Sequence, residues 1–189
     1  MRLRRLAYRS WSVPFVFVLA LVSAGIGLSL ASSNSGPDNA NLTVAAAGEV
    51  HLDPLYESGY SGDDSTGVVP LPEILDGRPL VMNFFSSTCQ PCIREMPALE
   101  AVHTRLGAEV QFVGVAYADA EDRSRDLVES TGVTYDTYSD QPGDALALVN
   151  AVGLPATAFI APNGDIEALH VGQLSEDDIH AKVNDLFDL

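Results

Sequence analysis

The stretch DGRPLVMNFFSSTCQPC, residues 76–92, joins an apolar run to two cysteines at Cys-x-x-Cys spacing. Residues 80–85 are mostly apolar and follow a glycine and a proline, which predicts a strand buried on both faces. Cys89 and Cys92 come next, and they are the only cysteines of the 189-residue chain. A chain that confines its cysteines to one such pair is expected to use them for thiol chemistry.

A helix is expected to begin directly after the pair. Pro91 suits the first turn of a helix, and apolar residues then recur at helical spacing until Gly107 ends the pattern. These apolar residues are Ile93, Met96, Leu99, Val102 and Leu106. Cys89 then lies at a helix N-terminus, where free amides and the helix dipole favour a thiolate and can lower a cysteine pKa from about 8.5 to roughly 3.5.

Three other uses of the pair compete with redox chemistry and are less favoured. A structural disulfide across two residues would restrain the unfolded chain very little. Covalent haem attachment requires a histidine directly after the second cysteine, and position 93 is isoleucine. Zinc would need two further ligands, but the four histidines have no ligand-like spacing: His51, His103, His170 and His180. We therefore expect no metal site.

The first 31 residues predict a signal that targets the chain to a membrane. Four arginines precede an uncharged apolar stretch, residues 13–31, and about 19 apolar residues can span a bilayer. Residues 29–31 form a passable cleavage site, so a secreted form stays open. We expect an uncleaved single-pass anchor at residues 1–31, with the arginines in the cytoplasm and the rest of the chain outside.

Between the anchor and the apolar run, residues 32–67 are rich in serine, glycine and acidic side chains. This composition predicts a flexible acidic tether. The apolar residues 42–47 could add an edge strand to it or could equally be a remnant of the signal. The folded domain is expected to occupy residues 68–189.

The charge of the chain is strongly asymmetric. All 26 acidic residues lie beyond the anchor, where only six of the ten basic residues lie, so this part carries about 20 net negative charges. Such a surface excludes nucleic acid as a partner. Solubility on an acidic surface explains the charge, and steering of basic partner proteins is the alternative.

The remainder of the chain alternates between strand and helix patterns. Expected strands are residues 110–117, 134–138, 156–160 and 166–171, and expected helices are residues 120–130, 144–152 and a segment capped by Ser175. In the helix at residues 144–152, the buried stripe is expected to hold Ala145, Leu148 and Val152. This order predicts an α/β fold with a central mixed β-sheet flanked by helices on both faces.

With these elements in place, residues 68–189 resemble the thioredoxin superfamily, and within it the membrane-anchored TlpA/ResA-like thiol-disulfide oxidoreductases. Three motifs in order carry the resemblance. Residues 76–92 are similar to the family's strand and active-site turn, and CIREMP, residues 92–97, is similar to its Cys-x-x-Glu-x-Pro continuation. VGLPATAFIAPNGDI, residues 152–166, looks like its cis-proline segment and hairpin.

The resemblance implies a role for each residue of the pair and its loop. Cys89 is the expected nucleophile that forms a mixed disulfide with a partner, and Cys92 then releases the partner and leaves a redox-active Cys89–Cys92 disulfide. No other cofactor is expected. Pro91 restricts the turn between the cysteines, and Gln90 brings no charge. Another protein must reduce the resulting disulfide.

Two further positions match family residues that face the pair. Pro155 corresponds to the cis-proline, which would turn the Leu154 backbone toward a substrate strand; an ordinary trans proline is the alternative. Glu95 corresponds to a carboxyl that adjusts the cysteine pKa values and relays protons, with a solvated helix glutamate as the alternative. Asn83 stands where thioredoxin keeps a buried aspartate, so Glu95 is the expected proton carrier.

One departure from the family concerns the surface that meets the substrate. Thr88 stands where the family usually has tryptophan, and Phe85 replaces another common aromatic residue. The apolar wall beside the cysteines is therefore expected to be smaller and more polar, which changes the fit to substrates.

The resemblance implies a monomeric, extracytoplasmic enzyme that reduces disulfides of envelope proteins such as apocytochrome c. Its electrons would come from an upstream membrane thiol donor. A thiol oxidase or oxidative folding catalyst is the alternative within the same chemistry. A non-catalytic module that senses redox state or binds copper is the alternative outside it.

Overall fold

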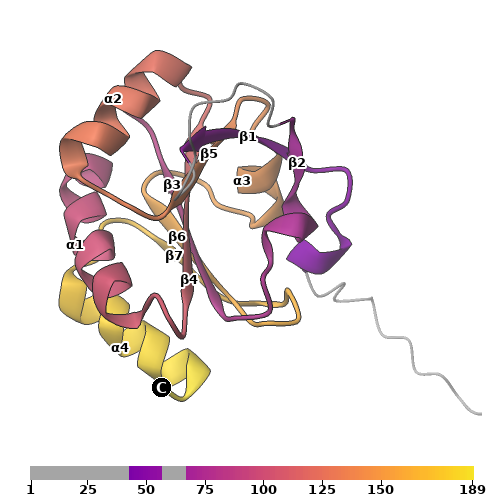
Figure 1. Cartoon of the computed structure of the whole chain (residues 1–189), viewed down its shortest axis with the longest axis vertical. Helices are drawn as coiled ribbons and strands as arrows, with labels where there is room; N and C mark the ends of the chain where they lie inside the picture. The colour runs from indigo at the N-terminus through magenta and orange to yellow at the C-terminus, as the bar shows by residue number, and fades with distance from the viewer. Residues whose placement is uncertain (1–42, 57–66) are drawn as a thin grey trace, which may run out of the picture. The chain divides into compact units, whose positions relative to one another are not determined.

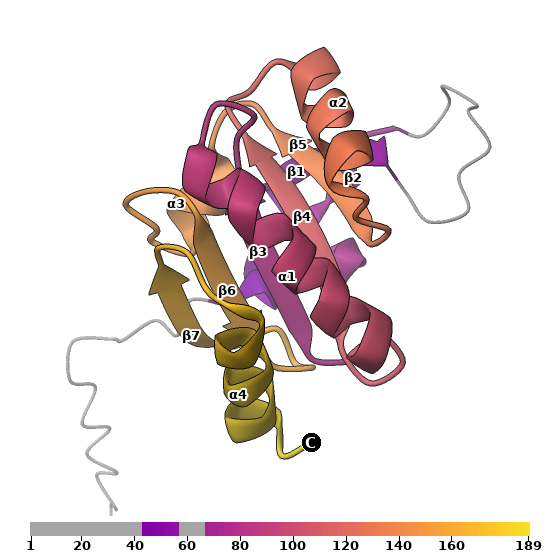
Figure 2. The ribbon, with the colours of Figure 1, turned by 90° about the vertical axis from the view of Figure 1, so that its left-hand side faces the viewer.

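The predicted mixed sheet is present and has seven strands. The computed structural model describes residues 43–56 and 67–189 (Figure 1), and within them the strand order is β2-β1-β5-β4-β3-β6-β7 (Figure 2). The strands are β1 (His51–Tyr56), β2 (Val69–Pro70), β3 (Leu80–Phe85), β4 (Gln111–Tyr117), β5 (Asp136–Asp140), β6 (Ala156–Ile160) and β7 (Ile166–Val171). Strands β3, β4 and β5 run parallel, and the outer pairings are antiparallel.

Helices cover both faces of this sheet, as the sequence predicts. The described residues form α1 (Gln90–Leu106), α2 (Glu121–Thr131), α3 (Asp144–Leu148), α4 (Glu176–Phe187) and the 3-10 helices η1 (Val44–Ala46) and η2 (Leu71–Ile74). Helices α1, α2 and α4 pack on one face, and α3 packs with the two 3-10 helices on the other (Figures 1 and 2). The fold is the predicted α/β class.

Strand β3 lies at the centre of both cores. Val81 and Phe85 join the core beneath α1, whereas Met82 and Phe84 join the core on the opposite face. All four side chains are fully buried. Apolar side chains on both faces are typical of a strand in the middle of an α/β sheet. The carboxyl end of β3 therefore delivers the cysteine pair from a rigid position.

The local signals for the helix ends are confirmed. Cys89 is the N-cap of α1, and Gly107 ends that helix. Gly132 ends α2 with a left-handed φ of 72°. Ser175 and Asp178 form the capping box that begins α4.

The folded domain begins earlier than the predicted boundary at residue 68. Strand β1 pairs with β2 and β5, although it lies within residues 32–67, the predicted tether. Leu52 and Leu55 are buried by this pairing, and Pro54 between them weakens the strand signal in the sequence.

Of the two interpretations left open for residues 42–47, the edge strand is wrong for the part that is described. Residues 44–46 form the 3-10 helix η1, and the hydroxyl of Thr43 accepts a hydrogen bond from the amide of Ala45 at 3.3 Å. Thr43 makes only an isolated bridge to Asp165. The N-terminal edge of the sheet is instead formed by β2 and β1.

Helix α3 is shorter than predicted. It ends at Leu148, and Asn150 follows with a left-handed φ of 57°, a conformation that cannot continue a helix. Val152 is 92% exposed, so it does not share a buried stripe with Ala145. Strand β5 also begins two residues later than predicted.

The predicted membrane anchor, residues 1–31, lies outside the described residues. Among the residues that are described, no helix is both long enough and apolar enough to cross a membrane. The described residues belong to one compact unit. The anchor therefore stays a prediction.

Candidate active site

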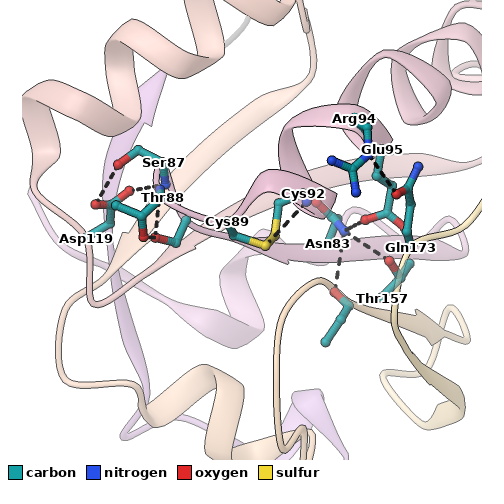
Figure 3. The surroundings of a disulfide bond; sticks show 12 residues. Asn83, Ser87, Thr88, Cys89, Cys92, Arg94, Glu95, Asp119, Thr157 and Gln173 are labelled. Atoms are coloured by element: carbon teal, nitrogen blue, oxygen red, sulfur yellow. Dashed lines mark hydrogen bonds between the residues drawn. A yellow bond between two sulfur atoms is a disulfide. The ribbon is translucent and has the colours of Figure 1, made fainter.

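Cys89 and Cys92 form a disulfide where β3 gives way to α1 (Figure 3). Cys89 is partly exposed, whereas Cys92 lies within the first turn of the helix and is fully buried. Pro91 also lies in this first turn, where its missing amide costs no helical hydrogen bond. The pair thus offers one sulfur to a partner and shields the other.

The N-terminus of α1 supplies the groups that favour a thiolate at Cys89. The amide of Cys92 donates a hydrogen bond to Cys89 Sγ at 3.3 Å. The turn is closed by the amide of Cys89, which donates to the carbonyl of Ser86 at 3.0 Å. A donor aimed at sulfur and the positive end of a helix dipole both stabilise negative charge there. The geometry therefore suits Cys89 as the attacking sulfur.

Glu95 lies one turn beyond Cys92 and on the same face of α1, because residues three apart on a helix are neighbours. Its side chain is fully buried, which excludes the alternative of a solvated glutamate. Its Oε1 accepts a hydrogen bond from the amide of Leu174 at 2.8 Å. Burial raises the pKa of Glu95 to about 7, against the opposing effect of the hydrogen bonds from Leu174 and Asn83. This carboxyl can therefore gain or lose a proton near neutral pH.

Asn83 on β3 links Glu95 to the neighbouring strand β6. Its Nδ2 donates to Glu95 Oε2 at 3.0 Å and to Thr157 Oγ1 at 3.0 Å. Asn83 and Thr157 are directly paired across the two strands, and both are buried. Figure 3 shows this polar group on one side of the disulfide. Asn83 therefore orients the carboxyl of Glu95 and does not itself carry a proton.

The Leu154–Pro155 peptide bond is cis, so the alternative of an ordinary trans proline is excluded. Pro155 is buried immediately before β6, and its carbonyl accepts a hydrogen bond from the amide of Gly172 at 2.8 Å. Leu154 is partly buried and packs, like Cys89, against the core that contains Cys92. The structure therefore brings the expected cis-proline segment and the cysteine pair to the same core.

The loop before Cys89 is held from the other side by Asp119. Ser87 Oγ donates to Asp119 Oδ1 at 2.9 Å, and the amide of Ser87 donates to Asp119 Oδ2. Asp119 follows β4, which runs parallel to β3, so the two segments leave the same edge of the sheet. Figure 3 shows this contact across the disulfide from Asn83 and Glu95.

The remaining predicted residues divide between surface and core. Thr88 and Gln90 are exposed beside Cys89, and Thr88 Oγ1 lies 3.1 Å from Ser86 Oγ. Phe85 is fully buried in the core beneath α1. Phe85 is therefore not part of a substrate-facing wall, and the polar Thr88 is the residue that shapes the exposed surface at this position.

Sequence reasoning misses Asp119, Ser87, Thr157 and Leu174. Asp119 had a usable signal, because it follows a predicted strand whose carboxyl end meets that of β3 if the two strands run parallel. Thr157 and the backbone amide of Leu174 had none, since their contacts depend on strand register and on where the loop before α4 runs.

Comparison with known proteins agrees with this site. Residues 56–169 match the family model described as the AhpC/TSA family. The chain is 29% identical over 184 residues to thiol-disulfide oxidoreductase ResA of Oceanobacillus iheyensis, which covers 96% of this chain and 89% of that protein. It is 28% identical to the thiol:disulfide interchange protein HelX of Rhodobacter capsulatus, over 92% of this chain and 95% of HelX.

A solved structure supports the same assignment. DsbF from MTB superposes with a TM-score of 0.61 at 26% identity and covers 72% of this chain and 93% of its own. The predicted thioredoxin-like fold and ResA-like resemblance are thereby confirmed. The cysteine pair and these relatives identify the protein as a thiol-disulfide oxidoreductase. The chain belongs to the AhpC/TSA family.

Proposed function

We propose that the protein is a disulfide reductase of the cell envelope that works through a Cys89/Cys92 dithiol–disulfide cycle. A membrane thiol donor reduces the pair, and the pair then reduces disulfides of envelope proteins. The resemblance to ResA-like proteins implies apocytochrome c, with its paired haem-binding cysteines, as the substrate class. The burial of Glu95 on the same helix face as Cys92 is the observation that carries the direction of the reaction.

The proposed cycle moves two electrons from the enzyme to the substrate. The Cys89 thiolate attacks one sulfur of a substrate disulfide, forms a mixed disulfide and expels the other substrate sulfur as a thiolate. Glu95 accepts the proton of Cys92, and the Cys92 thiolate attacks Cys89 Sγ. This second step breaks the mixed disulfide, releases the reduced substrate and leaves the enzyme disulfide.

Glu95 also supports the reducing direction energetically. A pair whose thiolate is strongly stabilised prefers the reduced state and therefore oxidises its partners. A carboxylate near the cysteines opposes thiolate formation, because two negative charges repel each other in a buried site. The amide of Cys92 and the N-terminus of α1 stabilise the thiolate instead. The reduction potential measures the net result of these opposing effects.

We expect the potential of the Cys89/Cys92 couple to lie near the thioredoxin value of about −270 mV and not near the strongly oxidising value of about −120 mV. The protein is equilibrated with a series of dithiothreitol redox buffers, and the reduced fraction is read by alkylation and mass measurement. A midpoint close to −120 mV would contradict the reductant role and assign the protein to the oxidase alternative.

The proposed cellular setting follows from the N-terminal sequence. Residues 1–31 anchor the protein in the membrane as a single-pass segment, and the catalytic domain lies outside the cytoplasm as a monomer. The acidic surface keeps the domain soluble there. Partitioning of the full chain into washed membranes, with its catalytic domain open to added protease in spheroplasts, tests the anchor and the orientation.

A further inference from the structure

Asp119 collects hydrogen bonds from both the active-site loop and helix α2. From the loop, Ser87 donates both its amide and its hydroxyl. From α2 and its N-cap, the amide of Ala120 donates to Oδ1 at 2.9 Å, and Ser124 Oγ donates to Oδ2 at 3.0 Å. One carboxylate therefore fastens two segments that are more than 30 residues apart in sequence.

The carboxylate stays charged although it is only 7% exposed. Burial acts to raise the pKa of Asp119, but the hydrogen bonds from Ser87, Ser124 and Ala120 outweigh it, so the pKa lies below its ordinary value. An ionised carboxylate accepts hydrogen bonds at both oxygens and binds its donors more strongly than a neutral group does. Asp119 can therefore hold all four donors at neutral pH.

The loop that Asp119 holds is the one that aims Cys89. Strand β3 is fixed up to Phe85, which pairs with Ala116 of β4. Four residues later comes Cys89, the N-cap of α1. Between these points Ser87 is tied to Asp119, and Cys89 closes its turn on the carbonyl of Ser86. A shift of Ser87 would therefore move the sulfur of Cys89 relative to the amide of Cys92.

We propose that Asp119 is a positioning residue of the redox site, which clamps the loop at Ser87 and thereby holds Cys89 Sγ against the N-terminus of α1. The inference rests on the proposed thiol–disulfide function and adds a residue that acts through Ser87. The competing role is a purely structural one, in which Asp119 only begins helix α2 through Ala120 and Ser124. The two roles differ in whether substitution of Asp119 changes the pKa of the Cys89 thiol.

The test uses the full chain in the reduced state with four variants: Asp119→Ala, Asp119→Asn, Ser87→Ala and Ser124→Ala. The pKa of Cys89 is measured from the pH dependence of iodoacetamide alkylation, which reports on Cys89 because Cys92 is fully buried. Reduction of a peptide disulfide gives kcat/KM, and thermal unfolding gives stability. Ser87→Ala and Ser124→Ala are matched, since each removes one hydroxyl donor from the same carboxylate.

We expect Asp119→Ala to raise the Cys89 pKa by about one unit and to lower kcat/KM at least about tenfold, because a misplaced sulfur loses its amide donor and its angle of attack. Asp119→Asn keeps one acceptor oxygen, so its Cys89 pKa and its kcat/KM should lie between those of the wild type and Asp119→Ala. Ser87→Ala shifts the Cys89 pKa in the same direction by less, while Ser124→Ala lowers stability and leaves that pKa unchanged.

Two results would overturn the proposal. If both Asp119 variants lower the Cys89 pKa, the carboxylate acts by its charge and not by holding the loop. If all four variants lose stability with no change in that pKa, Asp119 serves only helix α2. Alkylation needs no substrate, so the two proposals can fail separately. If the wild type shows no turnover but the Cys89 pKa still changes across the variants in the predicted order, the proposed function is rejected and the positioning role is supported.

Discussion

The Cys89→Ser variant is expected to lose reductase activity by at least about a thousandfold, which is part of the roughly 10⁶-fold or more by which enzymes accelerate reactions. The thiolate is the species that attacks a disulfide, and a serine hydroxyl cannot form the mixed disulfide. The partly exposed Cys89 is the sulfur that a partner can reach. Turnover of a peptide disulfide with dithiothreitol as electron source measures the loss.

Two further variants distinguish loss of the attacking sulfur from loss of activity through disturbed structure. Cys92→Ser leaves the attacking sulfur in place, so it is expected to stall as a covalent mixed disulfide that a non-reducing gel detects and that identifies the physiological partner. Thr104→Ala, an exposed residue of α1 that bonds Glu100, is expected to keep wild-type activity. Mixed disulfides formed by Cys89→Ser but not by Cys92→Ser would reverse the assigned order.

The same experiment distinguishes the proposed enzyme from a redox sensor or a copper-binding module. If the protein were a sensor, the wild type would show no multiple turnover of the peptide disulfide. Cys89→Ser would then cause no loss of activity. A copper-binding module would retain stoichiometric metal after purification and lose it in both cysteine variants. Either outcome would withdraw the enzymatic cycle while leaving the fold assignment intact.

The strand, turn and helix around the cysteine pair could be predicted because their signals are local. Strand β3 carries apolar residues on both faces, and the helix that follows has a proline in its first turn and apolar residues at helical spacing. The capping box of α4 is read from Ser175 and Asp178 alone. Such features need no knowledge of what packs against them.

Strand β1 and helix α3 show where local signals fail. Strand β1 contains Pro54 and lies in a region rich in polar residues, yet pairing with β2 and β5 buries Leu52 and Leu55. Helix α3 ends early because Asn150 adopts a left-handed conformation just ahead of the cis-proline segment. In both cases a contact or a turn beyond the segment decides its structure.

The polar contacts of the site could be predicted only in part. Glu95 and Asn83 are recognisable because they lie at fixed offsets from the cysteines in a known motif. Their partners are Thr157 in β6 and Leu174 in the loop before α4, which lie 74 and 79 residues away in the sequence. Only the pairing of β3 with β6 brings Thr157 opposite Asn83. Sequence spacing alone does not contain that register.

The second large effect is expected from Glu95→Gln, which removes the proposed proton acceptor one helical turn beyond Cys92. In the wild type, release of substrate from the mixed disulfide should accelerate as pH rises through about 7, where Glu95 loses its own proton and can accept that of Cys92. In the variant, the rate of release should no longer rise through about pH 7. The variant should resolve the mixed disulfide roughly 100-fold more slowly than the wild type at pH 7.5. Stopped-flow single-turnover measurements follow the step directly.

The site can accommodate the glutamine at the cost of one long hydrogen bond, from Asn83 Nδ2 to the carbonyl of Ala156 at 3.5 Å. Asn83 Oδ1 is buried and has no hydrogen-bond partner among the described residues. If the Asn83 amide turns over, this oxygen can accept hydrogen bonds from the new glutamine amide and from the hydroxyl of Thr157. Glu100→Gln is the matched control, since it removes one negative charge from the same helix at a partly exposed residue that bonds Thr134.

Stability measurements provide an independent check of the same carboxyl. The pKa of Glu95 is raised from 4.5 to about 7 on folding, so the native state binds the proton more tightly than the unfolded state does. The contribution of protonated Glu95 to the free energy of unfolding is therefore complete below about pH 4.5 and is lost as pH rises through about 7. A shift of this size corresponds to roughly 3 kcal/mol in the free energy of unfolding.

Glu95→Gln should therefore gain roughly 3 kcal/mol relative to the wild type between pH 4 and pH 8 in urea unfolding, because glutamine has no charge to desolvate. Glu100→Gln leaves Glu95 in place and should still lose stability as pH rises through about 7. Parallel stability curves for Glu95→Gln and wild type would mean that Glu95 does not titrate near neutral pH, and a proton relay through Glu95 would then have no basis. A carboxyl that both destabilises the fold when ionised and accelerates resolution is the combination expected of a buried catalytic base.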